Sequence, residues 1–499
     1  MQLRSAHGWR TLVAGLLLSI PFLVTAGDFT DQYIVETNDL NRLENFTEPL
    51  GIEVKPFIYY PNPSGETVEL YGDMFILRFS SDDQAAITTA TEAVGRLRGV
   101  KSVEPDRILD VSIPDWQDTE TLKKSRDALN PPPFTPNDPR YEDQWDKPIT
   151  ETDWAWSTTT GAGEGVAILD QGVDTAHEDL VDNLYMSWDF NENDANYYDI
   201  GGHGTQCCGV ACAKIDNGVG IAGVAGNANL MACKIWGTNP LYTSTISNAM
   251  NYAIDNGVRV ISMSWGGYEY SAFLNNIMSD AWNRGAFLCA GAANDNKDQP
   301  FYPAAYEKVM AVGGSNSSDE RWSGSNYGDW VQIFAPGGLS TKRGGGYGGV
   351  QATSFTTPQI AGLAALVWSA HPGASNQQVW ENIINGADTI DSDVGPILRM
   401  NSKKAVEAEI IAVEEKLHEP EFKLASTSIQ KGEVRLSAPS SATYTLRVFD
   451  ASGRGIHTEH GQTNNSGEIT FNSDLNEGVY FWRFVTVEGA ETGKFIYVD

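Results

Sequence analysis

Between residues 144 and 405, short apolar runs alternate with stretches of helical periodicity, and this alternation limits the fold more than any other feature. Helical patterns near 243–256 and 271–283 separate runs that are typical of buried strands. The runs are Val166 to Leu169, Leu230 to Ile235, Val258 to Met263, Ala286 to Ala290 and Val309 to Val312. Strands that alternate with helices form crossover units, so we expect an α/β fold with a mostly parallel sheet covered on both faces.

The segments on either side of this region have other patterns. Residues 31–113 predict a small α+β unit, and the last seventy or so residues alternate short strands with turns, as in a small all-β sandwich. Between the first two units, residues 114–140 contain several prolines and a basic run, which is typical of an exposed linker. The elements predicted in the first unit are the strand Tyr33 to Val35, the strand Met74 to Phe79, the helix Asp83 to Arg98 and the strand Val100 to Val111.

The first 26 residues have the pattern of a secretory signal. Arg4 and Arg10 precede an apolar stretch from Leu12 to Val24, and Ala26 ends a run of small residues suited to cleavage. The stretch is shorter than the roughly twenty residues of a comfortable membrane span, and no later segment is longer and as apolar. We therefore expect a chain that is secreted or held at the cell surface, with an uncleaved anchor as the alternative.

The net charge argues against two classes of partner, and the positions of the cysteines argue against a disulfide framework and a zinc site. The formal net charge of −31 repels nucleic-acid phosphates and anionic membrane surfaces, so neither is an expected partner. All 5 cysteines fall between Cys207 and Cys289, unlike the even framework of a small disulfide-stapled fold, and predict thiols or one bridge. Their spacing also argues against a zinc site.

Three polar residues lie where an open parallel sheet places its chemistry, at strand ends and helix starts. Asp170 ends an apolar run, His203 stands between two glycines, and Ser354 precedes a long apolar helix. A serine becomes a nucleophile when a neutral imidazole accepts its proton, and a carboxylate fixes that imidazole. Taken singly, each residue also fits an ordinary role as a turn residue, a helix-start residue or an N-cap.

Together, the motifs around these residues resemble the subtilisin-like serine peptidases, the subtilases. The motifs are Pro136-Asn137-Asp138-Pro139, Asp170-Gln171-Gly172, His203-Gly204-Thr205, Ser264-Trp265-Gly266-Gly267, Asn294-Asp295 and Thr353-Ser354. The resemblance implies Asp170 as the orienting carboxylate, His203 as general base and then acid, and Ser354 as the nucleophile of an acyl-enzyme. It further implies that Asn294 and the backbone N–H of Ser354 bind the oxyanion.

The resemblance also implies where a substrate lies. Ser264, Trp265, Gly266 and Gly291 should belong to the edges along which an extended substrate backbone pairs. Two departures from the family pattern, Ala293 and Ala352, stand where glycine is usual. Either methyl group could crowd the first specificity pocket or demand a changed backbone angle.

Two alternatives to a general endopeptidase stay open. One is a catalytically inactive relative that only binds. The other is a convertase-like processing peptidase selective for basic residues, because Trp265 and Cys207 resemble the proprotein-convertase and proteinase K branches. For Cys207 itself, a buried packing role under His203 is the expected one.

The chemistry needs no cofactor, but an oxygen-rich loop before His203 predicts a structural calcium ion. Calcium prefers six to eight oxygen ligands, and Asp189, Asp194 and Asp199 could supply several of them. The alternative is a solvated acidic loop.

The complete interpretation is a precursor that processes itself. We expect a signal at 1–26, an inhibitory propeptide and linker at 27–135, a catalytic domain at 136–408, a connector at 409–425 and a β-sandwich at 426–499. The sandwich is similar to a sorting domain of the type IX secretion route, with a carbohydrate- or protein-binding module as the rival. Expected partners are peptide or protein substrates, the chain's own propeptide and the secretion machinery.

Overall fold

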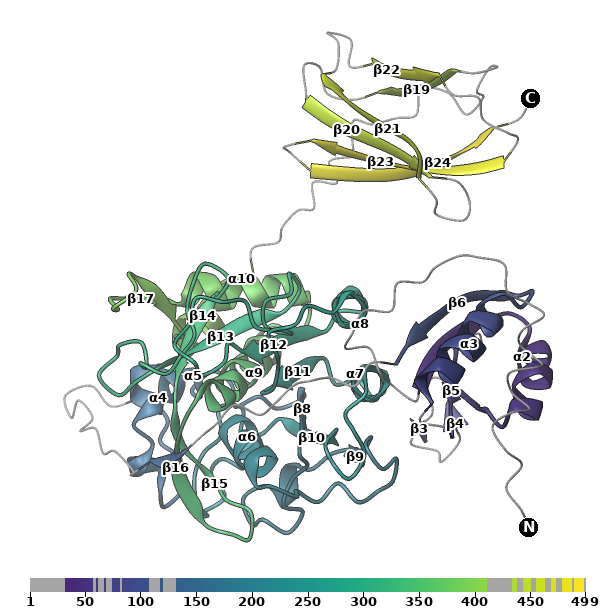
Figure 1. The fold of residues 1–499 in the computed structure, drawn as a ribbon. Coiled ribbons are helices and arrows are strands. Elements are labelled where there is room, and N and C mark those ends of the chain that lie inside the picture. The colour runs from purple at the N-terminus through teal and green to yellow at the C-terminus, as the bar shows by residue number, and fades with distance from the viewer. Residues whose placement is uncertain are drawn as a thin grey trace, which may run out of the picture. The chain divides into compact units, whose positions relative to one another are not determined.

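A computed structural model gives the arrangement of the chain (Figure 1). It describes residues 32–56, 60–61, 67–68, 74–80, 83–106, 117–119 and 132–410, and, nearer the C-terminus, residues 433–437, 443–449, 455–462, 468–472, 478–486 and 489–497. The predicted signal, most of the linker and most of the connector lie outside these residues. The chain divides into two compact units, Met1–Ile410 and Ile411–Asp499.

The N-terminal part is a four-stranded antiparallel sheet with two helices (Figure 1). Its strand order is β2-β5-β1-β6, and Asp83 caps the second helix by accepting hydrogen bonds from Ala85 and Ala86. Leu43 and Leu77 are fully buried between helices and sheet. The elements are β1 (Gln32–Thr37), α2 (Leu40–Thr47), β2 (Glu53–Pro56), β5 (Met74–Arg78), α3 (Gln84–Gly95) and β6 (Val100–Pro105), and a short pair β3 (Tyr60–Pro61) and β4 (Thr67–Val68). The α+β prediction holds, although the sequence reading missed α2 and β2.

A nine-stranded sheet forms the centre of the larger domain, in the order β17-β18-β14-β13-β12-β11-β8-β10-β9. Its pairs are parallel except for β17 with β18. The strands are β8 (Gly165–Asp170), β9 (Trp188–Asp189), β10 (Asn229–Lys234), β11 (Val260–Met263), β12 (Phe287–Gly291), β13 (Met310–Ser315), β14 (Ile333–Pro336), β17 (Asp388–Ile390) and β18 (Ile397–Arg399). The expected mostly parallel α/β sheet is confirmed.

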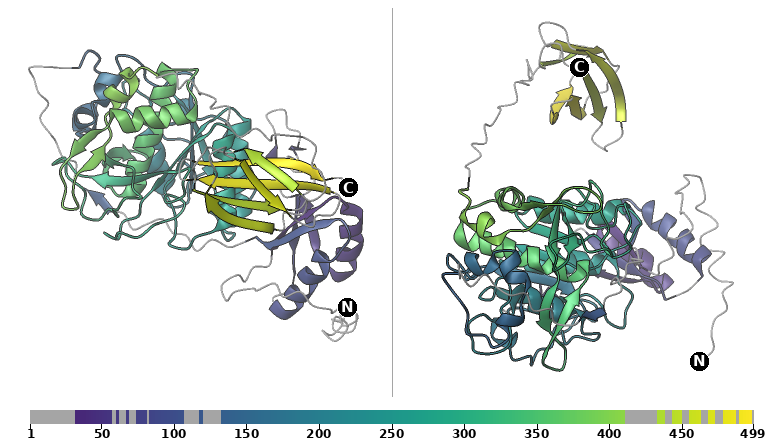
Figure 2. Two further views of the ribbon diagram at one scale, coloured as in Figure 1. Left: turned by 90° about the horizontal axis from the view of Figure 1, so that it is seen from above. Right: turned by 90° about the vertical axis from the view of Figure 1, so that its left-hand side faces the viewer.

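Helices cover both faces of this sheet, as the two views of Figure 2 show. One hydrophobic core joins the sheet to α6, α9 and α10, and a second joins it to α7 and α8. The helices are α4 (Asp146–Ile149), α5 (Thr152–Ala155), α6 (His203–Cys212), α7 (Thr243–Asp255), α8 (Ala272–Asn283), α9 (Thr353–Ala370), α10 (Asn376–Gly386) and α11 (Ser402–Glu407). A separate small sheet holds β15 (Gly338–Thr341), β16 (Tyr347–Gln351) and β7 (Gln117–Thr119).

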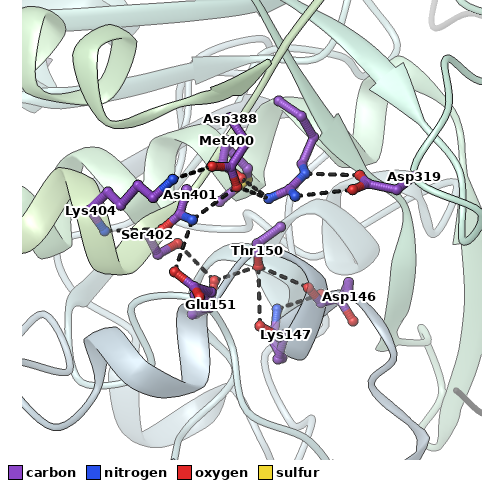
Figure 3. A network of polar contacts seen from close by, with 12 residues as sticks. Asp146, Lys147, Thr150, Glu151, Asp319, Asp388, Met400, Asn401, Ser402 and Lys404 are labelled. Carbon is purple, nitrogen blue, oxygen red and sulfur yellow. Dashed lines mark hydrogen bonds and ion pairs between the residues drawn. The ribbon is translucent and has the colours of Figure 1, made fainter. Parts of the chain in front are cut away.

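A buried polar network joins the two ends of the domain (Figure 3). The guanidinium of Arg399 binds the Asp319 carboxylate at 2.9 and 3.1 Å and lies 3.2 Å from Asp388. Asn401 donates hydrogen bonds to Glu151, beside α5, and to Asp388, both at 2.9 Å. Burial acts to raise the pKa of Asp388, but hydrogen bonds from Lys404 and Asn401 and the charge of Arg399 outweigh it and lower that pKa.

The second unit consists of antiparallel strands alone among its described residues. One sheet has the order β21-β20-β23-β24, and β19 pairs with β22. Leu446 and Val448 are buried on one face of β20, as alternation along a strand requires. The strands are β19 (Glu433–Ser437), β20 (Thr443–Phe449), β21 (Gly455–Gln462), β22 (Glu468–Asn472), β23 (Gly478–Thr486) and β24 (Gly489–Tyr497). Within the described parts of both units, no helix combines the length and apolar character needed to cross a membrane.

The Arg399 network predicts where the chain can be shortened. A chain that stops after Ile410 keeps the network and should unfold cooperatively at a melting temperature close to that of the full chain. A chain that stops after Leu398 loses Arg399, Asn401 and Lys404, and it also loses the buried Met400, Ala405 and Val406, so it should lose about 3 kcal/mol or more of stability. Thermal unfolding followed by circular dichroism compares the two. Equal melting temperatures would show that the network does not hold the domain together.

Candidate active site

Asp170 and His203 meet where β8 ends and α6 begins. His203 Nδ1 lies 2.9 and 3.0 Å from the two carboxylate oxygens of Asp170, and both side chains are buried. The approach is close enough to require glycine, because a Cβ on Gly204 would lie 2.1 Å from the carbonyl oxygen of Gly172. A hydrogen bond from Nδ1 to a carboxylate leaves Nε2 as the basic nitrogen of the neutral ring.

Asp199 fixes the start of α6. Its Oδ1 accepts hydrogen bonds from the backbone N–H groups of Gly201 and Gly202 at 2.9 and 2.7 Å. Its Oδ2 accepts from the backbone N–H and the hydroxyl of Thr205 at 2.8 and 2.5 Å. A carboxylate at a helix N-terminus satisfies donors that have no partner within the helix and complements the helix dipole. Asp199 therefore holds the turn that carries His203.

Ser354 lies in the first turn of α9, directly before Phe355, whose ring packs 5.3 Å from the His203 imidazole. Pro358 lies within α9, beyond its first turn. Because proline has no N–H, it cannot bond the carbonyl of the residue four positions earlier, which is Ser354. That carbonyl accepts instead from the Ser264 hydroxyl at 2.8 Å and from Cys207 Sγ at 3.4 Å. The missing helical hydrogen bond at Pro358 thus lets Ser264, after β11, and Cys207, in α6, bind the first turn of α9 at Ser354.

Asn294 follows β12 and faces the same turn. Its Oδ1 accepts hydrogen bonds from the backbone N–H and the hydroxyl of Thr353, at 2.9 and 2.8 Å. These bonds hold the amide so that its NH₂ group is the end able to donate. The preceding Ala293 has φ of 78°, in the left-handed region that disfavours alanine, whereas Ala352 has an extended backbone with φ of −173°. Only the first departure from glycine strains the chain.

The residues expected to line the substrate have different surroundings. Ser264 contacts the nucleophile's turn, and Gly291 faces Thr353 and Thr357. A Cβ on Gly266 would lie 2.4 Å from the Phe301 ring, so that edge is closely packed. The Trp265 side chain is 1% exposed and donates from Nε1 to the Leu169 carbonyl at 3.0 Å, which is compatible with the expected role of its backbone. At that position only the backbone is left for a substrate to contact.

The three aspartates predicted to bind calcium do not converge. Asp189 pairs with Lys234 at 2.6 Å, Asp194 is exposed, and Asp199 serves the start of α6. A lysine ammonium already supplies the positive charge that a cation would bring. The loop therefore does not fit calcium as predicted, and the physical reason is that its buried carboxylates have protein donors.

Another pair of carboxylates fits a cation better, and the sequence reading missed it. Asp138 and Asp179 are buried and both bind the loop 214–221: Asp138 accepts from the N–H groups of Asp216 and Asn217, and Asp179 accepts from Ile221. Burial raises the pKa of Asp138, and it raises the pKa of Asp179 to about 7. Among the residues that the structure describes, neither carboxylate forms an ion pair with a basic side chain. The presence of Asp138 in the motif Pro136-Asn137-Asp138-Pro139 was the available signal.

The cysteines are all free thiols and all buried. Cys207 Sγ lies 3.7 Å from His203 Nδ1, under the base as expected. Burial and then the charge of Asp170 raise the pKa of this thiol well above its usual value, so it stays protonated. Cys207 is a packing residue of the site rather than a nucleophile.

Comparison with known proteins agrees with this geometry. The model of the "Subtilase family" matches residues 161–412, half of the chain. The chain belongs to the subtilase family. It is thus a serine-type endopeptidase of that family, and a "Secretion system C-terminal sorting domain" matches residues 430–498 and indicates export.

Individual relatives of this subtilase support the assignment. It is 39% identical over 281 residues to the thermophilic serine proteinase of Bacillus sp. (strain AK1), covering 55% of this chain and 69% of that one. It is 37% identical to thermitase of Thermoactinomyces vulgaris over 281 residues, covering 55% of this chain and 100% of thermitase. A protease from Pseudoalteromonas arctica has 28% identity and a TM-score of 0.51 over 55% of this chain and 99% of that chain. Fervidolysin from Fervidobacterium pennivorans, at 18% identity and a TM-score of 0.64 over 95% of this chain and 77% of its own, shows the fold.

The role of Asp199 can be separated from metal binding by substitution. Asp199→Ala leaves four donor groups, three of them buried, without their acceptor, so we expect a loss of about 2–4 kcal/mol of stability. Displacement of His203 should lower kcat/KM for a peptide substrate by about 10- to 100-fold. Asp194→Ala, on the same loop but exposed, is the matched control and should change neither value by much. If both substitutions lowered stability and kcat/KM equally, and a chelator removed the difference between the variants and the unaltered enzyme, the loop would be a metal site after all.

Proposed function

We propose that this subtilase is an exported endopeptidase that cleaves peptide bonds through an acyl-enzyme at Ser354, with His203 as the base and Asp170 as its orienting carboxylate. The observation that carries the proposal is the buried Asp170–His203 hydrogen bond next to the α9 turn that holds Ser354. A packing role for these residues would not need a histidine and a carboxylate paired in a dry position, because burial of polar groups is costly.

The proposed reaction has two halves. His203 Nε2 takes the proton of Ser354 Oγ as the oxygen attacks the substrate carbonyl, and the imidazolium then gives that proton to the leaving amine. In the second half, water loses a proton to His203 as it attacks the ester carbonyl, and the imidazolium returns that proton to Ser354 Oγ as the C–O bond of the ester breaks and the acid product leaves. Asp170 keeps its charge throughout and stabilises the imidazolium.

The oxyanion is stabilised by donors that are in place before the substrate arrives. Thr353 holds the Asn294 amide by two hydrogen bonds, and the N–H of Ser354 is at the start of α9. Each such donor contributes about 2.7–4 kcal/mol to lowering the barrier in a site that excludes water.

The N-terminal α+β part is proposed to be an inhibitory propeptide. Asp106, directly after β6, is fully buried and accepts hydrogen bonds from the hydroxyls of Thr243 and Ser244 at 2.9 and 2.6 Å and from the Ser244 N–H at 3.1 Å. Its carboxylate thus binds the N-terminus of α7, where negative charge is favourable. Ile34 of β1 also joins the core that contains α7. These contacts support a precursor in which the unit is docked on the catalytic domain until the enzyme processes itself.

Two further assignments complete the proposal. The C-terminal unit directs the protein to the surface or the medium through the secretion machinery, supported by the sorting-domain match. A structural calcium ion is proposed to be bound by Asp138 and Asp179 together with oxygens of the loop 214–221, supported by two buried carboxylates that form no ion pair with a basic side chain in the described part of the chain. The ion would offset their mutual repulsion and hold the N-terminal segment of the domain to that loop.

The central test is the nucleophile. Ser354→Ala should lower peptide hydrolysis by at least about 10⁴-fold, abolish covalent labelling by a fluorophosphonate and leave the precursor uncut, because one oxygen performs all three reactions. Ser318→Ala, at an exposed serine, is the control and should behave as the unaltered chain does. If the purified Ser354→Ala protein were still processed, autocatalysis by Ser354 would be ruled out. If it were still labelled, another residue would be the nucleophile.

The calcium assignment predicts a shift in melting temperature. An ion present at about a hundred times its Kd stabilises the folded state by about 2.7 kcal/mol, so removal by chelation should lower the melting temperature by about 5–10 °C. Asp179→Asn should abolish the response to chelation, whereas Asp194→Asn should preserve it. If the fall in melting temperature on chelation disappeared in Asp194→Asn and persisted in Asp179→Asn, the ion would be bound by the acidic loop before His203 instead.

A further inference from the structure

Two chain segments, 264–267 and 291–295, bound the space beside the proposed nucleophile. They follow β11 and β12, which are neighbours in the sheet. Ser354 Oγ lies 3.4 Å from the Ser264 carbonyl oxygen on the first segment, and Asn294 on the second binds Thr353. An acyl carbon bonded to Ser354 Oγ therefore lies between the two segments. The side chain of the substrate residue that carries this carbon, the acyl residue, enters the space between them.

The Phe301 ring fills part of this space. A Cβ built on Gly266 would lie 2.4 Å from that ring. Side chains alternate along an extended segment, so Gly266 faces the same side as Ser264, toward the nucleophile's turn, while Trp265 faces the core that contains α7. Phe301 is only 4% exposed, yet in the described part of the chain it belongs to neither of the two cores that cover the sheet. Its burial comes from the first segment instead.

Phe301 is fixed in this position by its neighbours. The next residue, Tyr302, exchanges two backbone hydrogen bonds with Gly267, both of 2.8 Å. The Tyr268 ring packs edge-on against the Phe301 ring, with 5.1 Å between the ring centroids. Edge-to-face pairs of this kind add stability beyond the area that they bury. A substrate cannot displace the Phe301 ring without breaking this packing.

Tyr268 is in turn bound to the second segment. Its hydroxyl donates to the Asp295 carboxylate and accepts from the Asn326 amide at 3.1 Å. Asn326 is fully buried and also accepts from the Asp295 N–H at 3.1 Å. Burial, and then the hydrogen bond to Asp295, raise the pKa of Tyr268 to about 12, so the hydroxyl stays protonated at neutral pH and well above it. Tyr268 and Asp295 thus bridge the two segments next to Phe301.

We propose that Phe301, held by Tyr268, closes the first specificity pocket, so that this peptidase cuts after glycine, alanine or serine and rejects large acyl residues. The inference rests on the proposed peptidase function and adds its substrate class. An acyl side chain that extends far beyond its Cβ meets the Phe301 ring, and close-packed side chains do not overlap. Phe301 is therefore a specificity-determining residue.

The same argument decides between size and charge as the basis of selection. Asp295 is exposed, and its charge alone would favour a basic acyl residue. Its carboxylate, however, already accepts the hydrogen bond from Tyr268, which packs on Phe301. A lysine or arginine side chain needs more length than the closed pocket leaves. Size therefore outweighs charge, and a convertase-like preference for basic residues is not expected.

Substrate preference of the matured enzyme is the first test. Three peptide p-nitroanilides are compared that differ only in the acyl residue, which is alanine, phenylalanine or arginine. We expect kcat/KM for the alanine peptide to exceed that for each of the others by about 50-fold or more. A kcat/KM for the phenylalanine or arginine peptide equal to or above that for alanine would overturn the proposal.

Substitution of Phe301 tests the cause of the preference. Phe301→Ala removes the ring, so the ratio of kcat/KM for the phenylalanine peptide to that for the alanine peptide should rise by about 10- to 100-fold. Phe301→Leu retains more of the packing and should give an intermediate ratio if the alanine variant does not fold. Tyr270→Ala, at an exposed aromatic residue of the same loop, is the matched control and should keep the original ratio. An unchanged ratio in the folded Phe301 variants would show that Phe301 does not close the pocket.

Active-site titration separates this inference from the proposed function. A small fluorophosphonate carries no acyl residue, so its reaction with Ser354 does not depend on the pocket, and it counts the active molecules of every variant. Full labelling of the unaltered enzyme together with a preference for large acyl residues rejects the closed pocket and leaves the peptidase intact. Absence of labelling in the unaltered enzyme rejects the peptidase itself.

Discussion

The hydrogen bond between His203 Nδ1 and the Asp170 carboxylate is the contact on which the rest of the site depends. It is buried, so a strand end and a helix start must meet within hydrogen-bonding distance, with no room for water between them. The backbone meets that demand through Gly204, where no Cβ fits beside Gly172. The loop between them is then held by Asp199, whose four hydrogen bonds keep the helix start in place.

The nucleophile's turn is held by a different device. Pro358 leaves the Ser354 carbonyl without its helical partner, and the Ser264 hydroxyl from the end of β11 takes that role. The oxyanion residue Asn294 follows β12, the neighbour of β11, and is bound to Thr353. Neighbouring strands of one sheet therefore position the proposed base, nucleophile and oxyanion donor through short contacts with α6 and α9. This explains why substitutions outside the three reacting residues should affect catalysis.

Sequence reasoning reached the parts of this structure that depend on local pattern. Buried parallel strands are continuous apolar runs, so β8 and β10 to β13 were predicted nearly to their ends. It failed where the direction of a side chain decides the role. Asp189 and Asp199 lie in one polar loop, yet one turns to Lys234 in β10 and the other to α6.

Long-range pairing was also beyond the sequence. Nothing in Gln117–Thr119 distinguishes it from the polar linker around it, because the information lies in its partner β16. The same holds for Asp138 and Asp179, which come from separate segments and meet only through the loop 214–221. A pattern within a window of the chain cannot report an interaction whose two halves are far apart.

In the proposed precursor, cutting the chain and releasing the N-terminal unit are separate events. Ile34 is buried in the core that contains α7, and Asp106 is buried at the start of that helix, so both contacts survive hydrolysis of a bond beyond Asp106. What the cut removes is the covalent tether, which until then keeps the unit at a high effective concentration next to its docking surface. Once the tether is broken, dilution favours dissociation, and the same contacts that guided the precursor then set only the rate at which the site opens. Activation by the proposed route would therefore be limited by the packing of Ile34 and Asp106 as well as by the proposed chemistry at Ser354.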